Sequence, residues 1–222
     1  MSFLLVVGAG RLAAQTAPEW RRTGLEYLSA GKLTLATPAL QKACALETPP
    51  GDSCYYLARN YYALTEYEAA RKEFERLLAA SPSGPAYRAA ALNYSALGLD
   101  DDAEKNFRKA IEIGAGETRV DLGAFLFRQG RTIEAEKMLE AAVRANPESA
   151  RAHLESGRVL LQEGKLEAAV KRLEESIRRN PADWNAHLLL GRAYQRLGRD
   201  ADAARELQLG ESQWRQQAPR SR

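Results

Sequence analysis

Histidine and cysteine are scarce in this sequence, which contains two of each among 222 residues. His153 and His187 stand 34 residues apart, and no set of aspartates and cysteines at helical spacing from them completes a metal site. The serines are scattered and form no nucleophile motif. We therefore expect a non-enzyme with no metal, no cofactor and no catalytic residues, and assign both histidines a packing role.

A surplus of one charge is also missing, because 32 lysines and arginines nearly balance 29 aspartates and glutamates. This balance excludes a bulk attraction to nucleic acid or to an anionic membrane. Only nine prolines and sixteen glycines occur, so most of the chain can be regular structure. No segment alternates with period two for long enough to form a strand. These absences together favour an all-α protein.

The apolar run at residues 3–9 is too short to span a bilayer, which requires about 20 apolar residues. Small residues follow at 12–14, so residues 1–16 suggest a truncated export signal. The alternative is an unstructured N-terminus, because no basic residue precedes the run. Residues 8–13 also fit a dinucleotide-binding fingerprint, which we regard as accidental because no βαβ unit surrounds it. An exported protein is favoured, and a cytoplasmic one remains the alternative.

The rest of the chain repeats with a period of about 34 residues. Gly123, Gly157 and Gly191 are spaced 34 residues apart. Other glycines, alanines and leucines recur at the same spacing, and we call each set of equivalent positions in successive repeats a column. Towards the N-terminus, the spacing between some neighbouring repeats is one or two residues shorter than 34. All columns of a repeat share the same shortening, so the missing residues belong to the connecting loops. The pattern defines six units and a tail at 218–222. The units are 17–50, 51–83, 84–115, 116–149, 150–183 and 184–217.

Each unit is predicted to be a hairpin of two helices. In the fifth unit, apolar residues fall at helical spacing on both sides of Gly164, which permits a left-handed exit from the first helix. Pro181 ends the second helix and opens the next unit. One column of the first helices contains only glycine and alanine, and the column twelve residues later, in the second helices, contains only alanine. With small residues on both sides, the two helices of a hairpin can touch closely. The first column is Gly24, Ala58, Ala91, Gly123, Gly157 and Gly191.

This pattern resembles the tetratricopeptide repeat family over about residues 17 to 217. The resemblance is carried in the first unit by Trp20-x3-Gly24-x2-Tyr27, Ala36 and Leu40, and in the last unit by Gly191-x2-Tyr194, Ala203 and Leu207. It implies a right-handed superhelical solenoid whose concave groove is lined by the first helices and holds peptides or partner domains. Pro38 departs from the pattern, and we expect it to delay the start of the second helix of the first unit.

Four columns of the first helices face this expected groove, which makes 24 positions over six units. Aspartate and glutamate are absent from all of them, although about three would fall there by chance. The residues that we assign to partner binding are Arg21, Tyr55, Arg59, Tyr62, Arg88, Phe127, Arg128, Arg158, Arg192, Gln195 and Arg196. A basic, partly aromatic face suits an acidic segment or a terminal carboxylate. Alternatively, the arginines reflect composition, since 24 of the 32 basic residues are arginine.

Leu25 and Arg59 replace the paired asparagines of the chaperone-binding members of the family, so a chaperone-tail clamp is not expected. Cys44 lies near the end of one predicted helix and Cys54 early in the next, where antiparallel helices bring Cα atoms within disulfide range. If the protein is exported, we expect the two to form a disulfide, whereas in the cytosol they would stay reduced. The predicted function is a protein-binding scaffold for an acidic or extended peptide. The alternative is a structural part of a cell-envelope machine that uses the convex face or the ends of the array.

Overall fold

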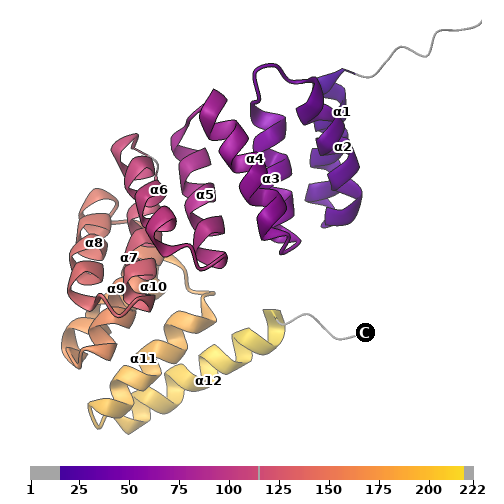
Figure 1. The fold of residues 1–222 in the computed structure, drawn as a ribbon. Coiled ribbons are helices and arrows are strands. Elements are labelled where there is room, and N and C mark those ends of the chain that lie inside the picture. Colours follow the sequence, from indigo (N-terminus) through magenta and orange to yellow (C-terminus); the bar gives the residue numbers. More distant parts are fainter. Residues whose placement is uncertain (1–15, 115, 218–222) are drawn as a thin grey trace, which may run out of the picture. The chain divides into compact units, whose positions relative to one another are not determined.

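The structure, a computed structural model, describes residues 16–114 and 116–217, and these ranges contain twelve α-helices and no strand (Figure 1). The chain divides into two compact units, residues 1–103 and 104–222. The predicted export signal lies outside the described residues except for Thr16. The all-α helical repeat solenoid is confirmed.

The N-terminal unit contains α1 (Ala17–Ser29), α2 (Leu33–Leu46), α3 (Asp52–Ala63), α4 (Tyr67–Ala80) and α5 (Gly84–Ala96). Helix α6 (Asp100–Glu112) crosses the boundary between the units. The C-terminal unit continues with α7 (Thr118–Arg128), α8 (Thr132–Ala145), α9 (Ala150–Gln162), α10 (Leu166–Arg179), α11 (Trp184–Arg196) and α12 (Asp200–Gln217).

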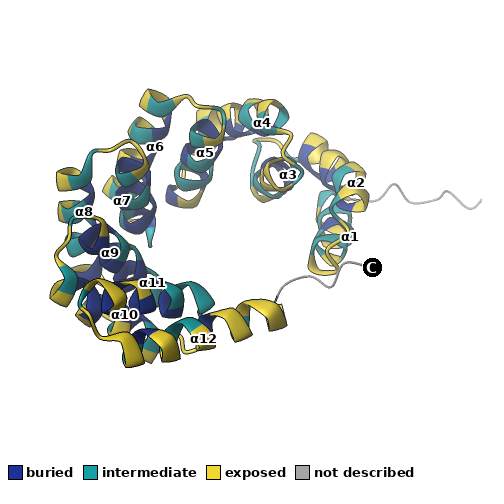
Figure 2. Ribbon diagram, turned by 90° about the horizontal axis from the view of Figure 1, so that it is seen from below, coloured by how far each residue is buried: buried dark blue, intermediate teal, exposed yellow. Residues whose placement is uncertain are grey.

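Within each unit the odd-numbered helices lie side by side, and the even-numbered helices pack against them (Figure 2). Helices α1, α3 and α5 form this row in the N-terminal unit, and α7, α9 and α11 form it in the C-terminal unit. The four columns expected to face the groove form one surface in each unit. We call this surface the first-helix face. This arrangement follows from the repeat, because a single hairpin leaves one apolar face uncovered and a neighbouring hairpin buries it.

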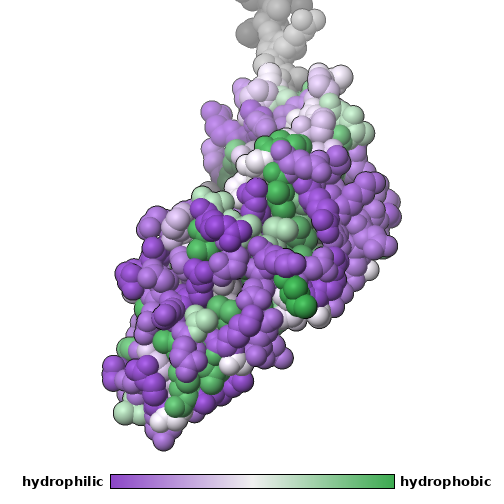
Figure 3. Space-filling model, turned by 90° about the vertical axis from the view of Figure 1, so that its left-hand side faces the viewer, coloured by the Kyte–Doolittle hydropathy of each residue, from purple (hydrophilic) through white to green (hydrophobic). Residues whose placement is uncertain are grey.

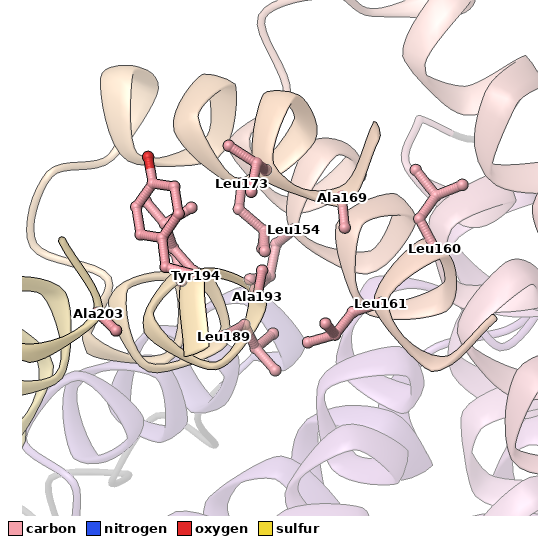
Figure 4. Close-up of a cluster of buried hydrophobic side chains, with 12 residues drawn as sticks. Leu154, Leu160, Leu161, Ala169, Leu173, Leu189, Ala193, Tyr194 and Ala203 are labelled. Carbon is pink, nitrogen blue, oxygen red and sulfur yellow. The ribbon is translucent and has the colours of Figure 1, made fainter. Parts of the chain in front are cut away.

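The core of the C-terminal unit shows how adjacent hairpins share this burial (Figure 4). Leucines of α9 pack against alanine and leucine of α10 and against residues of the next hairpin, formed by α11 and α12. The labelled members of the cluster are Leu154, Leu160, Leu161, Ala169, Leu173, Leu189, Ala193, Tyr194 and Ala203. Close approach inside the hairpin depends on Gly157, where an added Cβ would lie 2.7 Å from Cγ of Leu173. The column of small residues therefore sets the distance between the two helices of a hairpin.

Buried tyrosines join consecutive hairpins. The Tyr94 hydroxyl of α5 donates to Glu75 of α4 over 3.3 Å, and the Tyr194 hydroxyl of α11 donates to Glu174 of α10 over 2.8 Å. Burial, assisted by the neighbouring carboxylate, raises the pKa of each phenol to about 12. Each tyrosine therefore stays neutral and keeps its hydrogen bond at physiological pH.

The turn inside each hairpin requires a residue with left-handed backbone conformation. Glycine supplies it in five hairpins, with φ between 69° and 79°, at Gly31, Gly98, Gly130, Gly164 and Gly198. The hairpin of α3 and α4 has Thr65 at the equivalent position with φ of 61°. A β-branched side chain is strained in this region, so this turn is less stable than the other five.

Replacing Thr65 by glycine is expected to raise the free energy of unfolding by about 1 kcal/mol. Relief of the left-handed strain outweighs the extra freedom that glycine adds to the unfolded chain. Urea denaturation followed by circular dichroism measures the change. The control is Thr65→Ala, which keeps a Cβ and should gain much less. Equal stability of the glycine and alanine variants would show that Thr65 is not strained.

The structure corrects the prediction that Pro38 delays the second helix, because α2 begins at Leu33 with Pro38 inside it. Asn60 of α3 contacts the first turn of this helix. Its Nδ2 donates to the Leu33 carbonyl over 3.1 Å and to the Thr37 hydroxyl over 2.9 Å. These tertiary hydrogen bonds hold the first turn of α2 although proline supplies no N–H.

Trp214 also differs from the apolar stripe that the spacing of Ala203, Leu207 and Trp214 predicts for the last helix, because it is 51% exposed. Helix α12 is longer than α11, and its last turns run past the first residue of α11. There Gln213 and Gln217 donate to the carbonyls of Pro181 and Ala182. Trp214 therefore has no helix opposite it within its own hairpin.

The surface is largely polar. On the face shown in Figure 3, hydrophilic side chains cover most of the area, and apolar side chains form narrow strips between them. Within the described ranges, none of the helices has the combination of length and apolar character needed to cross a membrane.

Candidate functional site

The first-helix face of the N-terminal unit brings an arginine and aromatic rings together on α3. The guanidinium carbon of Arg59 lies 5.6 Å from the centroid of the Tyr55 ring, one helical turn away. Tyr55 packs edge-on against Tyr56, and the half-exposed Tyr62 packs against Tyr67 with ring centroids 5.5 Å apart. Arg59 itself is exposed. An arginine held over an aromatic ring keeps the N–H groups at the edge of its own guanidinium plane available for an incoming carboxylate.

Arg21 is already engaged within the N-terminal unit. Its Nη1 lies 3.4 Å from Oε1 of Glu47 and 3.3 Å from Oδ2 of Asp52. Glu47 also accepts hydrogen bonds from the backbone N–H groups of Gly51 and Ser53, so it caps the N-terminus of α3. Arg21 therefore contributes to the junction between the first two hairpins. We had not identified Glu47 from the sequence, where a glutamate before a Pro-Pro-Gly turn gives no capping pattern.

The remaining residues assigned to partner binding are spread over four further helices, α5, α7, α9 and α11. Arg88 is half-buried on α5, and Phe127 is half-buried on α7. Arg128 ends α7 and is exposed, as are Arg192 and Gln195 on α11. Among the described residues, no acid forms an ion pair with Arg59, Arg128 or Arg192. These three arginines are therefore available to an external anion.

Two of the assigned arginines in the C-terminal unit have internal partners. Arg158 lies 3.1 Å from Oε2 of Glu155, three residues earlier on α9, and Arg196 donates to the carbonyl of Leu161 near the end of α9. The i, i+3 spacing of Glu155 and Arg158 could have revealed this pair. We missed it because Glu155 stands in a neighbouring column.

Both histidines are buried at the start of a first helix. Nε2 of His153 lies 2.9 Å from the carbonyl oxygen of Pro147, and Nε2 of His187 lies 3.2 Å from that of Pro181. Nδ1 of His187 also contacts Glu206 at 2.7 Å. Each histidine thus ties its helix to the preceding proline turn. In the part of the chain that the structure describes, no three histidine, cysteine or acidic residues cluster as metal ligands.

Cys44 and Cys54 are joined by a disulfide with a Cα–Cα distance of 4.6 Å. Both residues are buried in the core between α2 and α3. Nη2 of Arg76, on α4, lies 3.3 Å from Sγ of Cys54 and forms an ion pair with Glu73. The disulfide therefore links the first two hairpins within their shared core.

A sequence model described as tetratricopeptide repeat matches residues 21–85, 121–171 and 154–218. No curated protein matches the chain. Among solved structures, the chain is similar to PilW, a widely conserved type IV pilus biogenesis factor, with 21% identity, a TM-score of 0.76 and coverage of 94% of this chain and 96% of that one.

The structure of pilF from Pseudomonas aeruginosa is similar with 18% identity, a TM-score of 0.75 and coverage of 92% and 93% of the two chains. YrrB, a TPR protein with an unusual peptide-binding site, is similar with 21% identity and a TM-score of 0.58, and the match covers 81% of this chain and 94% of that one. At these identities the solved structures support the fold alone.

Proposed function

Because the chain belongs to the tetratricopeptide repeat family, a fold of protein-interaction scaffolds, we propose that it binds an acidic, extended peptide on its first-helix faces and catalyses nothing. The observation that carries the proposal is the exposure of Arg59, Arg128 and Arg192 without an internal acid partner. Arginine binds carboxylates with two parallel N–H···O bonds, so exposed arginines on these helices are suited to an acidic chain.

The expected affinity comes from several weak contacts. An exposed ion pair contributes below about 1 kcal/mol, so no single arginine is sufficient. Contacts within one unit add their contributions: Arg128 and Arg192 in the C-terminal unit, and Arg59 with the rings of Tyr55 and Tyr62 in the N-terminal unit, where the rings supply apolar contact that salt does not screen. Binding should therefore weaken with salt without disappearing.

The proposal is tested with a fluorescein-labelled, glutamate-rich peptide whose binding is followed by fluorescence anisotropy. Combining Arg59→Ala, Arg128→Ala and Arg192→Ala is expected to weaken binding at least about tenfold and to flatten its salt dependence. A matched control changes the same net charge on even-numbered helices through Arg71→Ala, Arg172→Ala and Arg215→Ala. Circular dichroism should show unchanged helicity in both variants.

Equal loss of binding in the two triple variants would contradict the proposal. The arginines of the first-helix faces would then reflect composition, and the peptide would respond only to net charge. Binding of a lysine-rich peptide with similar affinity would contradict the acidic preference in the same way.

A second candidate is a structural component of a cell-envelope machine. It is favoured by the match to PilW and pilF over more than nine-tenths of each chain, and by the buried disulfide, which fits an oxidising compartment. In this case the protein is exported and uses its even-numbered helices or an end of the array. The test is capture of a partner protein from envelope extract. Equal capture by the wild type and by the triple first-helix variant, together with loss of capture by the Trp214→Glu variant, would favour this function over the first.

A further inference from the structure

A cavity of about 400 Å³ lies between α1 and α3 on the first-helix face of the N-terminal unit. Its walls are mostly apolar, and the four large apolar side chains that line it are partly exposed. They are Leu25 and Leu28 of α1, Leu33 at the start of α2, and Tyr56 of α3. Pockets for whole drug-sized ligands measure about 300–1,000 Å³. This cavity is at the lower end, so it has room for one large side chain of a bound peptide together with its neighbouring atoms.

The wall formed by α2 is held in place from behind. Asn60 is buried, and its Nδ2 bonds to the Leu33 carbonyl and the Thr37 hydroxyl fix the first turn of α2 against α3. The cavity is therefore formed before any ligand arrives, so binding does not have to order its walls.

Charge at the rim restricts what can occupy the cavity. Arg59 lines it, is exposed, and is paired with no acid among the described residues. An apolar occupant that carried a positive charge nearby would be repelled, and a neutral one would leave Arg59 without a partner. The complementary occupant combines a large apolar side chain with a neighbouring carboxylate.

We infer that this cavity selects a peptide in which a leucine- or phenylalanine-sized side chain stands next to a carboxylate that binds Arg59. The inference rests on the proposed function and specifies which acidic peptide the N-terminal unit prefers. The carboxylate belongs either to an adjacent aspartate or glutamate or to the chain end. Both sources present the same chemistry to Arg59.

The test uses short labelled peptides on the full-length protein. The parent probe has one leucine between two glutamates and an amidated C-terminus. A second probe replaces the leucine by alanine, a third replaces both glutamates by glutamine, and a fourth has glutamine throughout but ends in leucine with a free carboxylate. Burial of the leucine predicts that the alanine probe binds about tenfold more weakly than the parent. The third probe should lose binding, and recovery by the fourth would identify the chain end as a source of the carboxylate.

Protein variants locate the effect. Ala63 lines the cavity, is exposed and ends α3, so Ala63→Phe fills the cavity without disturbing the core. This variant should weaken binding of the parent probe about tenfold and leave the alanine probe unchanged. The matched control is Ala80→Phe, at the exposed end of α4, which should change neither.

Three outcomes would overturn the inference. Equal binding of the leucine and alanine probes, with both dependent on Arg59, would remove the cavity from recognition but leave the proposed function standing. Full binding of the probe with both glutamates replaced by glutamine would show that recognition does not require a carboxylate. Displacement of the parent probe by octanoate at equal affinity would assign the cavity to a small amphiphile. Failure of every acidic probe to bind would instead refute the proposed function itself.

Discussion

Replacing Gly157 by valine is expected to lower the free energy of unfolding by about 3 kcal/mol. A Cβ at this position would lie 2.7 Å from Cγ and 2.8 Å from Cδ2 of Leu173, which is fully buried. The leucine cannot move without displacing the core between the fifth and sixth hairpins. Glycine in a helix otherwise costs up to about 1 kcal/mol relative to alanine, so its presence here reflects helix contact. Urea denaturation followed by circular dichroism measures the loss.

Two controls separate overpacking from helix propensity. Gln208→Val places the same β-branched residue on an exposed face of α12 and should cost well below 1 kcal/mol by propensity alone, as expected from a range of about 0.7 kcal/mol for ordinary residues. Leu173→Ala combined with Gly157→Val should cost less than the sum of the two single changes, because the smaller side chain makes room. Strict additivity would show that Gly157 does not set the contact with Leu173.

Removal of the disulfide by Cys44→Ala together with Cys54→Ala is expected to lower the free energy of unfolding by about 2–3 kcal/mol. The bond closes a short loop between two hairpins and thereby limits the freedom of the unfolded chain. A reductant should destabilise the wild type by a similar amount and leave the double variant unchanged. If the oxidised wild type were no more stable than the variant, the bond would carry no structural role.

The same cysteines report on the compartment. Protein taken from its native host and alkylated without reduction is expected to gain no label, because both thiols are joined. Labelling of both cysteines would contradict the disulfide in the native protein and with it the proposal of export.

The helical repeat could be predicted in detail because it depends on residues whose effects are local. Glycine in the turns, proline between hairpins and small residues at fixed spacing each constrain the backbone within a few positions. In the second repeat, Thr65 stands at the position that glycine occupies in the other turns. The structure shows that the backbone is left-handed there as well. The pairing of Cys44 and Cys54 follows from the same hairpin geometry.

The state of each arginine could not be predicted from the columns, because partners come from outside them. Glu47 reaches Arg21 across 26 positions of sequence, and Glu155 reaches Arg158 from an adjacent column on the same helix. Position on the helix therefore indicated which arginines belong to the four columns, but only the structure distinguishes the exposed ones from those with an internal partner. The cavity beside Arg59 likewise depends on three helices at once.

The exposure of Trp214 and the position of Pro38 escaped prediction for a related reason. The length of α12 relative to α11 decides whether Trp214 has a neighbour, and the first turn of α2 is bonded by Asn60, which belongs to the next hairpin. Neither can be inferred from periodicity within one helix.

Binding of an acidic peptide by first-helix arginines is tested most directly by nuclear magnetic resonance of the arginine side chains. The Nε–Hε signals are assigned by single substitution and titrated with the glutamate-rich peptide. The signals of Arg59, Arg128 and Arg192 are expected to shift in a saturable manner, while those of Arg71 and Arg172 on even-numbered helices stay in place. Uniform small shifts of all arginines, or shifts confined to the even-numbered helices, would contradict the assignment of the first-helix faces as the binding surface.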